Sequence, residues 1–102
     1  MAQIAVDEAK IAAFCGQYHI QRLALFGSVL RPDFRPDSDV DVLVEFEPDA
    51  RHTLFDFVRI QAALENVLGR HVDLVSRRGI EASRNDLRKR AILNATEIVY
   101  GP

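Results

Sequence analysis

Hydrophobic residues recur along this 102-residue chain with two different spacings, every three to four residues in some segments and every second residue in others. The first spacing predicts helices and the second predicts short strands between them. The clearest strand covers residues 39–46, where every second residue is a valine or a phenylalanine and most residues between them are acidic. Such alternation sends one set of side chains into a core and the other to the opposite face of a sheet. Residues 22–26 and 71–75 predict two further strands, and residues 98–100 predict an edge strand or an extended tail.

Apolar residues at helical spacing predict three helices, which begin after the capping residues Asp7, Thr53 and Ser83. The first helix would bury Cys15 with its apolar neighbours. The second would end at Gly69, and the third would run to about Ala95.

Residues 31–38 carry two prolines among charged residues, which predicts a loop. A helix that begins at Ser28 would therefore last little more than one turn. The predicted order of elements favours an α/β fold, with a small mixed sheet flanked by helices. A length of 102 residues is typical of one domain, so we expect residues 1–102 to form a single domain.

Composition narrows the classes of protein. Hydrophobic residues make up 48% of the chain and charged residues 27%, which predicts a packed core rather than disorder. A net charge of −2 argues against a broadly positive surface for nucleic acid, and direct nucleic-acid binding stays open. A single cysteine fits a reducing compartment. No export signal begins the chain and no run reaches the ~18 apolar residues of a membrane span, so we expect a cytoplasmic protein.

The strongest chemical signal is Gly27-Ser28, followed after ten residues by Asp39-Val40-Asp41. Residues two apart in a strand share a face, with Cα atoms about 6.6 Å apart, so Asp39 and Asp41 can converge on metal ions. Mg²⁺ prefers carboxylate and phosphate oxygens, and two Mg²⁺ ions about 4 Å apart stabilise the attacking and leaving oxygens of an in-line displacement. The pattern therefore predicts nucleotidyl transfer from a nucleoside triphosphate.

The Gly27-Ser28 pair fits the binding of phosphate. A glycine at a strand end lets the backbone approach a ligand, and N–H groups at the start of the following turn attract phosphate oxygens. Ser28 adds a hydroxyl donor, and Arg31 adds either charge-assisted bonds to phosphate or an ordinary surface charge.

The runs LFGSVLR at residues 25–31 and PDSDVDVLV at residues 36–44 resemble the signature of the minimal nucleotidyltransferases of the DNA polymerase β superfamily. The resemblance covers nearly the whole chain, because these proteins place a third aspartate on a later strand, where HVDLV stands at residues 71–75. It implies the polymerase-β-like nucleotidyltransferase fold.

The resemblance also implies roles for individual residues. Nucleotide binding falls to Gly27, Ser28 and Arg31, and both catalysis and the binding of Mg²⁺ fall to Asp39, Asp41 and Asp73. The third aspartate would help to deprotonate the acceptor hydroxyl. Many stand-alone members are antitoxins that silence a partner HEPN-domain ribonuclease by transferring AMP from ATP to one of its tyrosines.

Three functions remain open from the sequence: transfer to a protein tyrosine, transfer to a small molecule or RNA, and binding alone with a vestigial site. The base preference, the number of nucleotides transferred and the oligomeric state are not determined. The basic residues between Arg77 and Arg90 fit a solvated helix face as well as a contact to triphosphate, RNA or a partner. Phe55 and Phe57 are candidates to line a nucleotide pocket. Phe57 is expected in the core instead, and the sequence leaves both roles open for Phe55.

Overall fold

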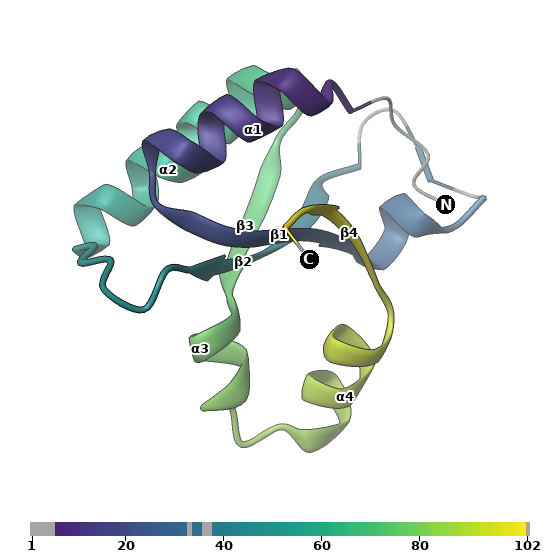
Figure 1. Cartoon of the computed structure of the whole chain (residues 1–102). Helices are drawn as coiled ribbons and strands as arrows, with labels where there is room; N and C mark the ends of the chain where they lie inside the picture. The colour runs from purple at the N-terminus through teal and green to yellow at the C-terminus, as the bar shows by residue number, and fades with distance from the viewer. Residues whose placement is uncertain (1–5, 33, 36–37, 102) are drawn as a thin grey trace.

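The computed structural model describes residues 6–32, 34–35 and 38–101, so part of the predicted loop and the start of the chain lie outside it. Its elements form two helical layers around one sheet (Figure 1). In chain order they are α1 (Glu8–Gln17), β1 (Ile20–Phe26), the 3₁₀ helix η1 (Gly27–Leu30), β2 (Val40–Phe46), α2 (Leu54–Leu68), β3 (Val72–Ser76), α3 (Arg77–Glu81), α4 (Asp86–Asn94) and β4 (Thr96–Tyr100).

The sheet has four strands in the order β3-β2-β1-β4. β1 pairs antiparallel with β2 and with β4, whereas β2 and β3 run parallel. This arrangement confirms the predicted small mixed sheet. The parallel pair matters most for the site, because it brings the start of β3 beside the start of β2.

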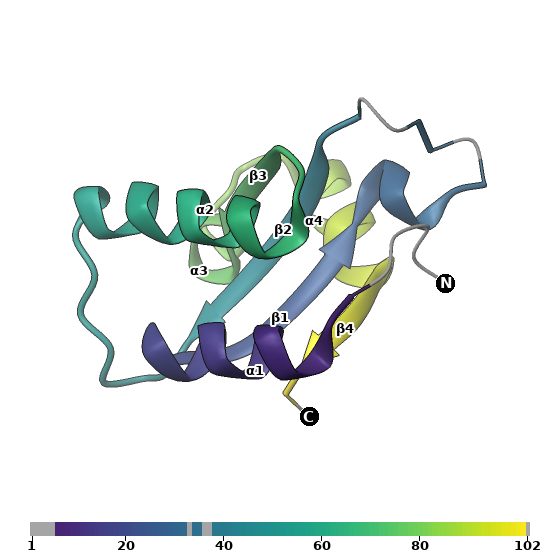
Figure 2. The ribbon, with the colours of Figure 1, turned by 90° about the horizontal axis from the view of Figure 1, so that it is seen from above.

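The two faces of the sheet have different cores. Val40, Val42 and Val44 are fully buried in the main core, which packs against α1 and α2. The opposite face holds a smaller cluster in which Leu43 and Phe26 of the sheet pack with Ile80 of α3 and Ile92 of α4. Figure 2 shows α1 and α2 lying over the sheet from above. The alternation predicted for residues 39–46 is therefore confirmed, and Asp41 lies on the face of α3 and α4.

Local signals set most helix ends as predicted. The side chain of Asp7 caps α1, and Thr53 forms a capping box with Asp56 at the start of α2. Gly69 ends α2 in the left-handed conformation, with φ of 68°. Cys15 is buried as expected, and this burial raises the pKa of its thiol to about 12.

Two details differ from the prediction. The cap of α4 is Asn85, whose side chain accepts a hydrogen bond from the N–H of Arg88, and not Ser83. The short helix α3 was not predicted, because only Ile80 in its five residues is buried and a single buried position gives no period. Within the described residues, no helix combines the length and the apolar character that a membrane crossing requires.

Candidate active site

Asp41 and Asp73 lie side by side on neighbouring strands. They are register partners in the parallel pair of β2 and β3, so their side chains lie on the same face of the sheet. Neighbouring strands are about 4.8 Å apart. Asp39 stands two residues before Asp41, directly ahead of β2. The N–H of Val40 donates to the carbonyl oxygen of His71 at 2.9 Å, which fixes the starts of both strands together. The structure therefore brings the three predicted aspartates to one place.

The Gly27-Ser28 turn lies directly against Asp41. Gly27 has φ of 78°, and a Cβ atom built at this position would collide with the Asp41 carboxylate. Phe26, the residue before the turn, is the register partner of Asp41 in the antiparallel pair. Val29 is fully buried and holds η1 against the core. Only glycine satisfies both the backbone angle and the lack of space at position 27.

The surroundings of Asp41 disfavour the charged form of its carboxyl group. Burial raises the pKa of Asp41 above its ordinary value, and the negative charges of Asp73 and then Asp39 raise this pKa further. The positive charges of Arg88 and Arg31 act in the opposite direction. A site that concentrates negative charge in this way is prepared for a cation.

Arg31 and Arg88 both act on the Asp41 charge, but only Arg31 was predicted as a site residue. Arg31 follows η1 directly, so the motif that contains Gly27 also predicted its position. Arg88 belongs to α4, almost fifty residues further along the chain than the Asp-x-Asp motif. The sequence signal for Arg88 was only its membership of a basic cluster, which does not tell which members face the site.

The carboxylates do not form a closed cage. Over residues 6–32, 34–35 and 38–101, no three His, Cys, Asp or Glu side chains are arranged to hold a metal ion by themselves. Asp39 and Asp73 are exposed, whereas Asp41 is half-buried. The arrangement is an open acidic surface, and a bound cation would need further oxygen ligands from phosphate or water.

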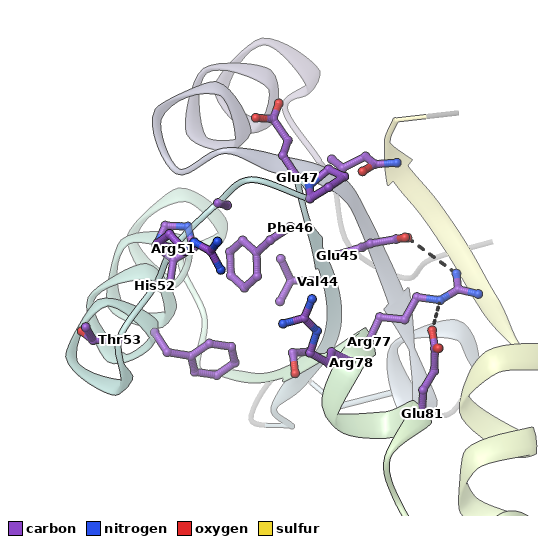
Figure 3. A pocket seen from close by; sticks show the side chains of 15 residues that line it. Val44, Glu45, Phe46, Glu47, Arg51, His52, Thr53, Arg77, Arg78 and Glu81 are labelled. Atoms are coloured by element: carbon purple, nitrogen blue, oxygen red, sulfur yellow. Dashed lines mark hydrogen bonds and ion pairs between the residues drawn. The ribbon is translucent and has the colours of Figure 1, made fainter.

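A cavity of about 500 Å³ lies at the other end of β2, around Val44 and Phe46 (Figure 3). Arg77 lines it and forms ion pairs with Glu45 at 3.6 Å and with Glu81 at 2.8 Å. None of the six predicted site residues, all of which the structure describes, lines this cavity. The predicted chemistry therefore belongs to the open surface and not to the cavity.

Three further phenylalanines differ in their surroundings. Phe57 packs against the main core as expected, and it also lines the cavity at the far end of β2. Phe55 is 81% exposed on α2. Phe34 packs against the core with the guanidinium of Arg70 5.0 Å from its ring centre.

Comparison with curated proteins finds protein adenylyltransferases. The protein adenylyltransferase MntA of Thermococcus cleftensis is 35% identical over 66 residues. The matched segment is 65% of this chain and 65% of MntA, so the chain spans just under two thirds of that relative.

Solved structures share the fold. A candidate minimal nucleotidyltransferase matches with a TM-score of 0.67 and 37% identity, over 88% of this chain and 86% of that one. A toxin–antitoxin complex with AMP-PNP matches at a TM-score of 0.70 and 20% identity, over 95% of this chain and 75% of that one. The complex of a tri-AMPylated HEPN toxin from Shewanella oneidensis with its MNT antitoxin matches with a TM-score of 0.62 and 21% identity. This match covers 93% of this chain and 70% of that one.

The family assignment rests on a match that covers almost all elements of the fold. The sequence pattern of the nucleotidyltransferase domain matches residues 8–99, from the first helix to the last strand. The carboxylate surface and the Gly27-Ser28 turn both lie inside this range. This chain therefore belongs to the nucleotidyltransferase domain family.

Proposed function

We propose that this protein transfers AMP from ATP to a tyrosine hydroxyl on a partner HEPN ribonuclease toxin in the cytoplasm, and so acts as its antitoxin. One observation carries the chemical part of this proposal. The turn at Gly27 lies against Asp41, and Asp41 lies directly beside Asp73. A phosphate held by the turn would therefore sit next to the carboxylates that act on it.

Three residues are proposed to hold the triphosphate. The positive φ of Gly27 sets the turn into η1, and the N–H and hydroxyl groups of Ser28 at the start of η1 would donate to a phosphate oxygen. Arg31 follows η1, and its positive charge, which acts on the Asp41 carboxyl, would also attract phosphate.

The carboxylates fit Mg²⁺. Aspartate oxygens are the ligands that Mg²⁺ prefers, and their open arrangement leaves positions for phosphate oxygens and water. Asp39 and Asp41 would hold the ion that arrives with the triphosphate, and Asp73 would help to hold the catalytic ion on the side of the acceptor. When bound, the two ions would neutralise charge on the attacking and leaving oxygens of the displacement.

Asp73 is proposed to take the proton of the acceptor. The tyrosine oxygen attacks the α-phosphorus of ATP, and the bond from that phosphorus to the bridging oxygen of the pyrophosphate breaks. The phenol proton moves to the Asp73 carboxylate, which is exposed and reachable from outside. The products are an AMP–tyrosine phosphodiester and pyrophosphate.

The similar proteins support the acceptor. MntA is named a protein adenylyltransferase, and one similar structure holds an AMPylated HEPN toxin with its antitoxin. The carboxylates of this chain lie on an open surface, which suits an acceptor side chain that arrives on another protein.

The test is the mass of the partner after reaction. The chain is incubated with ATP, Mg²⁺ and the HEPN protein encoded beside it, and the intact mass of the HEPN protein is measured. We expect whole AMP additions that map to tyrosine, and none with the Asp41→Asn variant. A HEPN protein that binds the chain but stays unmodified would refute transfer and favour a binding-only antitoxin. Modification of an added RNA or small molecule instead would refute the tyrosine acceptor.

A further inference from the structure

Some members of the basic cluster between Arg77 and Arg90 bind other groups of the protein. Arg77 is bound by Glu45 and Glu81 at the far end of β2 (Figure 3). The Nζ of Lys89 donates to the carbonyl oxygen of Glu81 at 3.0 Å and so ties α4 to α3. These two side chains have structural partners, and the roles of the two other basic residues of α4, Arg88 and Arg90, depend on the direction in which they point.

The packing of α4 turns Arg88 toward the sheet. Ile92 is buried against the face of the sheet that carries Phe26 and Leu43. Arg88 precedes Ile92 by four residues, one helical turn, so it shares the sheet-facing side of α4. Lys89, at three residues before Ile92, lies on the flank toward α3. Arg88 therefore lies on the flank away from α3.

The residues that Ile92 packs against are neighbours of the carboxylates. Phe26 is the register partner of Asp41, and Leu43 lies two residues from Asp41 on the same face. Ile92 thus packs beside the strand positions that flank Asp41, and Arg88 stands one helical turn from it. Arg88 forms no ion pair within the residues that the structure describes, and its side chain is exposed. Its guanidinium is therefore available to a ligand bound at the carboxylates.

We propose that Arg88 binds the β- and γ-phosphates of the nucleotide and stabilises the pyrophosphate as it leaves. This inference rests on the proposed function. Three carboxylates and a triphosphate together carry more negative charge than two Mg²⁺ ions neutralise, so a further cation lowers the cost of binding. A guanidinium also donates two parallel hydrogen bonds to phosphate, which suits the charge that develops on the leaving group.

Binding measurements on matched variants test the proposal. The affinities for Mg²⁺–ATP and for AMP are measured by calorimetry on the parent, Arg88→Ala, Arg88→Lys and Arg90→Ala. Arg90 is the control, because it is an exposed arginine two residues from Arg88 that points away from the sheet. We expect Arg88→Ala to weaken ATP binding about 10-fold or more, the effect of one lost hydrogen bond to a charged group. AMP lacks the β- and γ-phosphates, so its affinity should change little.

The other variants separate a specific contact from general charge. Arg88→Lys should recover part of the ATP affinity, and Arg90→Ala should bind ATP as the parent does. Equal losses for ATP and AMP, or equal losses in the Arg88 and Arg90 variants, would overturn the proposal. A parent that binds no Mg²⁺–ATP would refute the proposed function and this inference together, whereas normal ATP binding by Arg88→Ala would refute only the inference.

A double-mutant cycle on the protein without ligand gives a second readout. Arg88→Ala should lower the melting temperature of the parent, because the carboxylates then repel one another with one offsetting positive charge fewer. The same change in the Asp41→Asn background should cost less, since one of the repelling charges is gone. Equal costs in the two backgrounds would show that Arg88 does not act on the carboxylates.

Discussion

At the residue scale, Asp41 is the side chain at which stability and function conflict. It is half-buried, and it has two acidic neighbours, Asp73 on β3 and Asp39 along the chain. Its pKa is raised. A raised carboxyl pKa means that the folded state disfavours the ionised form. The stability associated with the protonated form is present below the ordinary aspartate pKa and is lost as the pH rises through the raised folded value. At neutral pH, the empty protein is thus less stable than it would be without this charge.

Replacing Asp41 by asparagine should therefore stabilise the empty protein at neutral pH. The difference in melting temperature from the parent should shrink as the pH falls into the acid range, because the parent carboxyl is then protonated as well. The same variant should lose the stabilisation by Mg²⁺–ATP, which for the parent is about 2.7 kcal/mol at a hundredfold excess over Kd. Thermal melting across pH, with and without Mg²⁺–ATP, measures both effects. An empty Asp41→Asn protein that melts below the parent at neutral pH would contradict this explanation of the raised pKa.

Asp73 should separate binding from chemistry. It lies on β3, is exposed, and is proposed to take the acceptor proton. Asp73→Asn should bind Mg²⁺–ATP within a few-fold of the parent but transfer AMP at least ~10²-fold more slowly, the low end of the contribution of a general base. Calorimetry and single-turnover transfer on the same sample provide the comparison. Transfer at the parent rate would remove Asp73 from the mechanism.

At the element scale, η1 and the turn before it place the phosphate-binding groups. Ser28→Ala should weaken ATP binding modestly, on the order of 1 to 3 kcal/mol for a bond to a charged group. Gly27→Val should weaken it more, since a side chain at this positive φ would also displace the Asp41 carboxylate. Titration of both variants with Mg²⁺–ATP checks the order. If both bind ATP as the parent does, the turn does not hold phosphate.

The start of α2 depends on its capping box. Thr53 accepts a hydrogen bond from the N–H of Asp56, and the Asp56 carboxylate accepts one from the N–H of Thr53. Thr53→Ala should lower the free energy of unfolding by about 1 kcal/mol, the usual loss on removal of such a cap. Thr53→Ser keeps the hydroxyl and is the control in urea unfolding. A stability unchanged by the alanine would mean that the box is not formed in solution.

Local signals predicted most elements, and long-range contacts account for the rest. The alternation in residues 39–46 and the caps at Asp7 and Thr53 are properties of short segments, and the structure confirms them. The cap of α4 is Asn85 instead of Ser83, because each of these polar residues satisfies a local cap pattern and packing selects between them. The position of Arg88 depends on how Ile92 of α4 packs against the sheet, which no local pattern reveals.

At the scale of the whole molecule, the topology assembles the site. The parallel pairing of β2 with β3 brings Asp41 beside Asp73, and the antiparallel pairing of β1 with β2 brings the turn at Gly27 against Asp41. The motif predicted these residues as a set, since the spacing of Gly-Ser and Asp-x-Asp matches the family. The roles of these residues in binding and catalysis remain proposals that the variants above test.

The fate of each phosphate of ATP tests nucleotidyl transfer most directly. The chain and its HEPN partner are incubated with Mg²⁺ and ATP labelled at the α-phosphate, and in parallel with ATP labelled at the γ-phosphate. Attack at the α-phosphorus should move the α-label to the partner protein and leave the γ-label in released pyrophosphate. A partner labelled from the γ-position, or from neither position, would contradict nucleotidyl transfer by this protein.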